Sequence, residues 1–212
     1  MSGVSNLSFE ELARQASLLP QEKLLAIKNN KNTLSIGIPK ESTFQEHRVP
    51  LSPMAVQLLA QNGHTIRIEN GCGDKANFTD LEYSKMGGEI TLDKKSIYEC
   101  DIILRVAPPT DEEIELMKPK QVLISAIQLV RMKEETVRKL LSKGITAIGY
   151  EFLRNDENVL PIIRSMSEIA GRASVLIAAE YLSNYNSGKG ELFGGIPGIQ
   201  PTQVVVIGAG SV

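Results

Sequence analysis

Short apolar segments alternate with helical patterns from residue 34 onward, and this alternation constrains the fold more than any other feature of the sequence. Such alternation is typical of βαβ units, whose strands run in parallel and whose helices cover both faces of the sheet. The sequence therefore predicts one α/β domain over residues 34–160, with a mostly parallel, Rossmann- or flavodoxin-like sheet flanked by helices. The expected strands are residues 34–38, 65–68, 101–106, 122–127 and 146–152.

Capping residues mark the helices of this domain. Ser52 is an N-cap residue followed by Pro53 at the first helical position, and Gly63 stands where a left-handed residue would end the helix. The two other helices expected here are residues 81–86, ended by Gly87 and Gly88, and residues 133–142, ended by Gly144.

Residues 1–33 form a separate N-terminal extension, for which the pattern predicts helices. Ser8 and Glu11 have the spacing of a capping box, and Pro20 is expected to open a second short helix. Such an extension typically packs on its own domain or on a partner subunit, so we expect no chemistry here.

A longer helix is expected over residues 166–185, with Ser165 or Ser167 near its N-cap. Its positions are apolar nearly all round, which predicts a helix buried on several sides, between two domains or in a subunit interface. A loop rich in glycine and proline follows at residues 188–201. Residues 161–203 are therefore interpreted as a linking helix and loop.

The last segment of the sequence has the pattern of a nucleotide-binding turn. Residues 204–207 are β-branched and lead into Gly208-Ala209-Gly210. A hydrophobic strand followed by G-x-G opens the dinucleotide fingerprint, in which the first glycine permits a tight turn and the second lets the backbone approach a pyrophosphate. The alternative is an ordinary turn at a strand end. Because the third glycine would follow residue 212, we expect residues 204–212 to be the first strand of a truncated dinucleotide-binding domain.

The composition argues against several functional classes. Hydrophobic residues make up 42% of the chain and the formal net charge is -2, with no basic stripe and no Trp, so nucleic-acid binding is not expected. No apolar run approaches the roughly 20 residues of a membrane helix, and the polar, acidic N-terminus does not fit a signal peptide. Cys72 and Cys100 form no CxxC pair, which predicts no metal site and reduced thiols in a cytoplasmic protein.

Two segments carry side chains suited to ligand binding. Arg48 lies in a loop between a strand end and a helix N-terminus, where open α/β sheets bind ligands, and an arginine there can hold a substrate carboxylate through two parallel hydrogen bonds. The alternative is a solvated loop arginine. Residues 166–172 (MSEIAGR) combine polar residues at a helix start with Gly171, which favours either close ligand approach or a buried helix that needs a small residue.

Several motifs occur together in the order of one enzyme family. Pro39-Lys40-Glu41, followed by the RVxLxP motif of residues 48–53, resembles the opening of alanine dehydrogenases and of transhydrogenase alpha subunits. Gly71-Cys72-Gly73, residues 194–198 and residues 204–210 are similar to later motifs of the same family. From about residue 34 to its end the chain thus resembles the alanine dehydrogenase/pyridine nucleotide transhydrogenase family, and MSEIAGR is similar to the alanine dehydrogenase version.

The resemblance implies a role for each matching residue. Arg48 would hold the substrate carboxylate, Ser167 would contact the nicotinamide cofactor, and Gly208 and Gly210 would approach its pyrophosphate. The implied activity is that of an NAD-dependent dehydrogenase, a homo-oligomer when intact, that converts L-alanine to pyruvate and ammonia. The family's acidic ribose-binding residue and catalytic aspartate would lie beyond residue 212, so the fragment alone is expected to be inactive.

Two positions depart from the alanine dehydrogenase pattern. Ala107 stands where that group carries a substrate-contacting lysine, and Gln128 stands where it carries an acid/base histidine. Glutamine cannot transfer a proton near neutral pH. Arg105 is a candidate to replace the missing positive charge. Of the two histidines, His64 is expected to be structural, whereas His47 is a candidate for lining the cleft.

These departures leave alternatives open. Transhydrogenase alpha subunits also lack the lysine and the histidine, because their hydride passes between two nucleotides, so an NAD(P) transhydrogenase alpha-type subunit fits the sequence. A non-catalytic family member that binds NAD and acts in regulation fits the losses at Ala107 and Gln128 as well. A dehydrogenase of the same superfamily that acts on a different amino acid is a further alternative.

Overall fold

The computed structural model describes residues 33–194, 196–208 and 210. The helices expected within residues 1–33, including those at Ser8 and Pro20, therefore lie outside the described residues, and so does Ala209 of the glycine turn.

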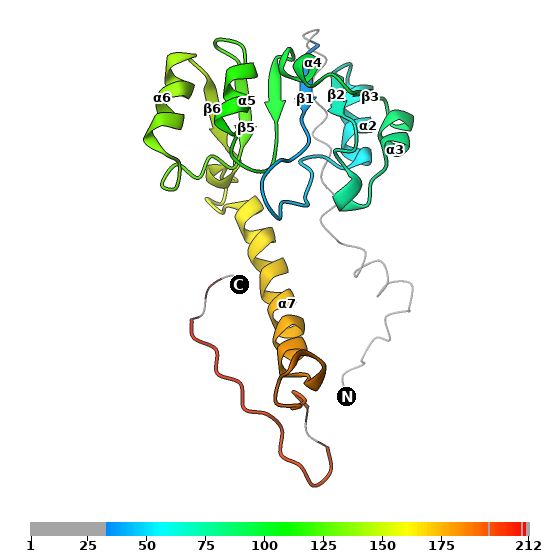
Figure 1. Ribbon diagram of the computed structural model, residues 1–212, viewed down its shortest axis with the longest axis vertical. Helices are drawn as coiled ribbons and strands as arrows, with labels where there is room; N and C mark the ends of the chain where they lie inside the picture. Colours follow the sequence, from blue (N-terminus) through cyan, green and yellow to red (C-terminus); the bar gives the residue numbers. More distant parts are fainter. Residues whose placement is uncertain (1–32, 195, 209, 211–212) are drawn as a thin grey trace, which may run out of the picture. The chain divides into compact units, whose positions relative to one another are not determined.

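Six strands form one parallel sheet in the order β3-β2-β1-β4-β5-β6 (Figure 1). The sheet confirms the α/β fold predicted from the alternation, and its order is that of Rossmann folds rather than of flavodoxin-like folds. The direction of winding reverses between β1 and β4, which are hydrogen-bonded neighbours. The strands are β1 (Ser35–Ile38), β2 (Thr65–Glu69), β3 (Gly88–Thr91), β4 (Ile102–Leu104), β5 (Val122–Ser125) and β6 (Thr146–Gly149).

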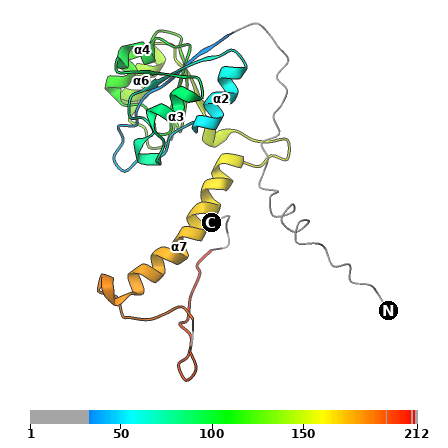
Figure 2. The ribbon, with the colours of Figure 1, turned by 90° about the vertical axis from the view of Figure 1, so that its right-hand side faces the viewer.

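Helices cover both faces of the sheet, and β4 shows how the core is divided. Ile103 packs into one hydrophobic cluster, together with side chains of α4, α5 and α6, whereas Ile102 and Leu104 pack against a second cluster that includes α2 and α3. Because successive side chains of a strand point to opposite faces, the two clusters lie on opposite sides of the sheet. Figure 2 turns the α2 and α3 side toward the viewer. The helices are α2 (Pro53–Gln61), α3 (Asp80–Lys85), α4 (Lys94–Tyr98), α5 (Asp111–Leu116) and α6 (Glu134–Ser142).

Helix α2 begins and ends where its capping residues predict. The Ser52 side chain accepts a hydrogen bond from the Ala55 backbone N–H at 3.4 Å, and Pro53 occupies the first turn. Gly63 follows the helix with a φ of +88°, a left-handed conformation that glycine adopts without steric cost. The chain then enters β2, so the helix delivers the strand that pairs with β1.

Three short elements, β3, α4 and α5, are missing from the sequence-based expectation. α4 has five residues and α5 has six, which is too short for helical periodicity to be recognised. β3 begins at Gly88, which the sequence pattern assigns to the end of the preceding helix. The strand expected over residues 146–152 is shorter than predicted. β6 ends at Gly149, and a 3-10 turn, η2 (Tyr150–Phe152), follows it.

The long helix α7 spans Pro161–Leu182, so it starts and ends earlier than the predicted range of 166–185. Pro161 lies at the start, where its fixed φ suits the first helical turn, and the N-cap residue Leu160 makes no side-chain capping bond. Ser165 and Ser167 therefore lie inside the helix, and the prediction that one of them caps it is wrong.

Burial of α7 on several sides was expected, but none of its residues is buried within the described part of the chain. Leu176 and Tyr181 are 74% and 72% exposed. The segment 204–207 has no regular secondary structure and pairs with no other described strand, and Ile207 is 97% exposed. The strand predicted there is therefore not formed in this structure, because a β-strand needs a neighbour with which to exchange backbone hydrogen bonds.

Replacing Thr79 by alanine is expected to lower the free energy of unfolding by about 1 kcal/mol. The Thr79 Oγ1 accepts from the Glu82 backbone N–H at 3.2 Å, and the Glu82 carboxylate accepts from the Thr79 backbone N–H at 2.7 Å, so α3 begins with a capping box. Without the hydroxyl, the Glu82 N–H loses its acceptor. Urea unfolding measures the loss. Thr79→Ser keeps the hydroxyl and should retain most of the stability; equal losses in the two variants would contradict the capping role.

Candidate functional site

The reversal between β1 and β4 places two strand ends side by side at the carboxyl edge of the sheet. Pro39-Lys40-Glu41 follows β1, and Arg105-Val106-Ala107 follows β4. Open parallel sheets bind their ligands in the crevice outside this point. The polar side chains at these two strand ends therefore define the candidate site.

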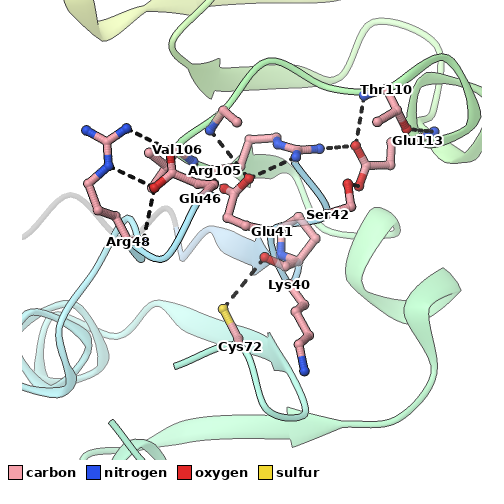
Figure 3. A network of polar contacts seen from close by, with 12 residues as sticks. Lys40, Glu41, Ser42, Glu46, Arg48, Cys72, Arg105, Val106, Thr110 and Glu113 are labelled. Carbon is pink, nitrogen blue, oxygen red and sulfur yellow. Dashed lines mark hydrogen bonds and ion pairs between the residues drawn. The ribbon is translucent and has the colours of Figure 1, made fainter. Parts of the chain in front are cut away.

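A buried chain of charges lies at the base of the site. The Arg105 side chain has no exposed surface, and its Nη2 donates to Glu41 Oε2 at 2.9 Å while its Nη1 donates to Glu113 Oε2. Figure 3 shows the Arg105 guanidinium flanked by the two carboxylates. The idea that Arg105 replaces the family's missing lysine as a substrate-binding cation is therefore wrong, because both of its terminal nitrogens are bound to buried acids.

Glu41 joins the two strand ends directly. Its Oε1 accepts from the Val106 backbone N–H at 2.5 Å, and its Oε2 accepts from the Ala107 backbone N–H at 3.4 Å. One carboxylate thus satisfies two backbone donors beyond β4 as well as the Arg105 side chain. The loop after β1 is thereby fixed to the end of β4.

Glu113 connects the same cluster to α5. It occupies the third position of that helix and forms a capping box with Thr110, whose backbone N–H donates to Glu113 Oε2 at 2.8 Å. Burial by itself raises the pKa of the Glu113 carboxyl, but the charge of Arg105 and the Thr110 hydrogen bond outweigh it and hold the pKa below its ordinary value. Glu113 is therefore ionised at neutral pH and completes the ion pair.

Arg48 stands in the loop between β1 and α2, as the sequence predicts, and its side chain is 57% exposed. Its Nε donates to Glu46 Oε1 at 2.8 Å and its Nη2 donates to Glu46 Oε2 at 2.7 Å. The hydrogen bonds from Arg48 hold the pKa of the Glu46 carboxyl below its ordinary value. Arg48 is thus a guanidinium that solvent can reach and whose orientation a neighbouring carboxylate fixes.

Ala107 and Gln128, the two departures from the alanine dehydrogenase pattern, lie at adjacent strand ends after β4 and β5. Ala107 is only 5% exposed. Gln128 is exposed, has a φ of +47°, and donates its backbone N–H to Glu151 Oε1 at 2.7 Å. Neither side chain can exchange a proton, so the described residues at these positions supply no acid or base.

Tyr150 is a residue of the site that the sequence did not single out. Its hydroxyl donates to the Val106 carbonyl oxygen at 2.5 Å, which brings η2 against the end of β4. A signal was available, because Tyr150 lies near the carboxyl end of the strand predicted over residues 146–152, and in the structure it directly follows β6. Polar residues at that position reach the crevice in parallel sheets.

The two histidines and the two cysteines make no metal site. His64 Nδ1 accepts from the Leu34 backbone N–H at 3.2 Å, in keeping with its expected structural role. His47 borders a small recess beside Arg48 and Cys72. Burial raises the pKa of the Cys72 thiol to about 12, so it remains protonated. Among the residues that the structure describes, no group of three or more His, Cys, Asp or Glu side chains is placed to hold a metal ion.

The residues expected to contact the cofactor are described only in part. Ser167 lies in α7 next to Met166, whose Sδ is 3.3 Å from Arg48 Nη1. Gly208 has a φ of +113°, and open space surrounds the position of a Cβ there and at Gly210. This conformation fits the tight turn that the first fingerprint glycine makes. The structure does not bring these glycines into contact with Arg48.

Comparison with known protein families places the site in context. The family model "Alanine dehydrogenase/PNT, N-terminal domain" matches residues 37–170, which include the sheet except for the first two residues of β1, together with the buried ion pairs and Arg48. The chain belongs to the alanine dehydrogenase/PNT family. The model of the family's C-terminal domain matches residues 174–212.

Curated relatives in this family carry the name alanine dehydrogenase. One from Methanococcus maripaludis is 39% identical over 178 residues, which are 84% of this chain and 48% of the relative. Another, from Staphylococcus saprophyticus, is 37% identical over 175 residues, or 82% of this chain and 47% of the relative. The chain therefore spans about half the length of the curated relatives that it matches.

Solved structures of the family have the same fold. An L-alanine dehydrogenase superposes with a TM-score of 0.75 and 37% identity, covering 79% of this chain and 46% of that one. A transhydrogenase from Sinorhizobium meliloti superposes with a TM-score of 0.63 and 26% identity, covering 69% and 44%. In the described part of this chain, no helix is long and apolar enough to cross a membrane.

Proposed function

We propose that the full-length protein is an NAD-dependent alanine dehydrogenase, which oxidises L-alanine to pyruvate and ammonia. The observation that carries this proposal is the exposed, oriented Arg48 guanidinium beside the switch point of the sheet. The names of the relatives that are 37–39% identical support the same reaction. The amino-acid substrate has a carboxylate that matches the geometry of a guanidinium.

Each residue of the site has a proposed task in that reaction. Arg48 binds the carboxylate and orients the Cα–H bond, while the Glu41–Arg105–Glu113 chain keeps the strand ends beneath it fixed. Ser167 would contact the nicotinamide of the cofactor, and Gly208 and Gly210 would approach its pyrophosphate. NAD, held there, would supply the hydride acceptor. Neither Ala107 nor Gln128 can transfer a proton near neutral pH, so the acid/base group of this proposal would come from outside residues 1–212.

We also propose a division of the chain into functional segments. Residues 1–33 are an N-terminal extension, residues 34–160 the substrate-side domain, residues 161–203 the linking helix and loop, and residues 204–212 the start of the NAD-binding domain. The exposed apolar side chains of α7 support a role in assembly, so we infer a homo-oligomer. The free thiols of Cys72 and Cys100 favour the cytoplasm as its compartment. Light scattering of the full-length protein tests its oligomeric state.

A transhydrogenase alpha-type subunit is the second candidate function. It is favoured by Ala107 and Gln128, because hydride transfer between two nucleotides needs no acid or base from the substrate side. The transhydrogenase superposition supports it to a smaller degree, at 26% identity. A family member that binds NAD but catalyses no reaction is a further candidate, because it too would need no acid or base at Ala107 and Gln128.

Turnover by the full-length protein decides among these functions. We expect NADH to form, seen as absorbance at the nicotinamide band, when L-alanine and NAD are mixed with the protein at mildly alkaline pH. D-alanine is the matched control substrate and should give no signal. Clear NAD binding without NADH formation would contradict the dehydrogenase proposal and favour the transhydrogenase or the non-catalytic protein.

A further inference from the structure

Arg48 directs three of its hydrogen bonds to a single carboxylate, that of Glu46. The Glu46 Oε1 accepts from the Arg48 backbone N–H at 3.0 Å and from Nε at 2.8 Å, and Oε2 accepts from Nη2 at 2.7 Å. Figure 3 shows the two side chains joined in this way at the edge of the site. The backbone bond and the side-chain bonds together fix both the loop and the rotamer of Arg48.

The two partners differ in exposure. The Glu46 side chain is 12% exposed, whereas the Arg48 side chain is 57% exposed. A guanidinium has five N–H groups in a rigid fork, and Glu46 takes the edge formed by Nε and Nη2. The other edge is formed by Nη1 and Nη2. Among the described residues, the acceptor on this edge besides Glu46 is the sulfur of Met166, 3.3 Å from Nη1, and a thioether is a weak acceptor. That second edge is free for a stronger acceptor.

We propose that Glu46 is a positioning residue, which presents the Nη1–Nη2 edge of Arg48 to the substrate carboxylate. This inference rests on the proposed function. A long, exposed arginine loses rotamer freedom when it binds a ligand, and a side chain that is already held loses less. The bond to Glu46 therefore favours substrate binding, although its negative charge partly offsets the positive charge of Arg48. We expect orientation to outweigh the charge, because solvent screens charges at this exposed position.

Kinetics of Glu46 variants in the full-length protein test this role. Glu46→Ala is expected to raise the KM for L-alanine and for pyruvate about tenfold, and Glu46→Gln less, because the amide oxygen still accepts from Nε. The kcat should stay within about twofold of the original in both variants. Glu89→Ala is the matched control, because it removes an exposed ion pair with Arg67 on β2 and β3 and should leave KM unchanged.

A double-mutant cycle separates positioning from general damage to the loop. In an Arg48→Ala background, Glu46→Ala should add no further rise in KM, because its effect passes through Arg48. Calorimetric binding of pyruvate gives the same comparison without turnover. A lower KM in either Glu46 variant would show that Glu46 competes with substrate, and an unchanged KM, or full additivity in the cycle, would equally overturn the inference.

The same variants distinguish this inference from the proposed function. If Arg48→Ala strongly lowers kcat/KM for L-alanine while the Glu46 variants behave like the unmodified protein, the function stands and the role of Glu46 is refuted. If the unmodified protein neither turns over alanine nor binds pyruvate, both are overturned.

Discussion

Arg105→Met is expected to lower the free energy of unfolding by about 3–5 kcal/mol. The substitution leaves the carboxylates of Glu41 and Glu113 buried side by side without the guanidinium that binds both. Methionine fills much of the arginine volume, so the loss reports the charge rather than a cavity. In calorimetry of the full-length protein, the transition that contains this domain should move down by roughly 6–20 °C.

Two further variants test whether the burial of the charges causes this loss of stability. Arg67→Met removes an ion pair of the same kind with Glu89, but its partners are 37% and 60% exposed, so we expect a loss of less than about 1 kcal/mol. Adding Glu41→Gln and Glu113→Gln to Arg105→Met should restore part of the stability, because a neutral amide needs no counter-charge. An Arg105→Met protein as stable as the original would refute the account of this cluster.

Arg48→Ala is expected to reduce kcat/KM for L-alanine about 100- to 1,000-fold, which is the usual effect of truncating one partner of a hydrogen-bonded charge pair. The substrate carboxylate loses two parallel charge-assisted bonds, and the two available substitutes fail for structural reasons. Ala107 carries no charge, and Arg105 is committed to its two acids. Initial rates of NADH formation by the full-length protein measure the loss.

The geometry of the guanidinium matters as much as its charge. Arg48→Lys keeps the charge but cannot form two parallel bonds, so we expect only a partial recovery over alanine. Arg138→Ala serves as the control, since it removes a solvated arginine from an exposed pair on α6. Retention of kcat/KM within threefold in Arg48→Ala would mean that another group binds the carboxylate.

Local signals explain which elements the sequence predicts well. α2 is bounded by Ser52, Pro53 and Gly63, each of which acts within one turn of its own position, and all three behave as expected. α4 and α5 escape prediction because five or six residues are too few to show a period, and no glycine marks their ends as Gly87 and Gly88 mark the end of α3. The start of α7 was misplaced because Pro161, rather than a serine cap, opens the helix.

The residues of the site also fall into two groups: those that a local sequence signal identifies, and those whose role depends on which strands lie side by side. Arg48 was found from its place after a strand, which is a local property. The pairing of Arg105 with Glu41 was not, because it depends on β1 lying beside β4, and periodicity within each strand carries no information about strand order. Arg105 therefore looked like a free cation in the sequence, whereas the fold encloses it. The roles of Ser167, Gly208 and Gly210 stay predictions.

The bond between Glu41 and Arg105 also has a consequence for how the protein folds. These residues are 64 positions apart in the chain, and both halves of the sheet must meet before the bond can form. Long-range contacts of this kind are made only after the entropy of closing the intervening chain has been lost. The loop that carries Arg48 is fixed by this bond at its start, so we expect a newly synthesised chain to acquire its carboxylate-binding geometry as one of the last events of folding rather than one of the first.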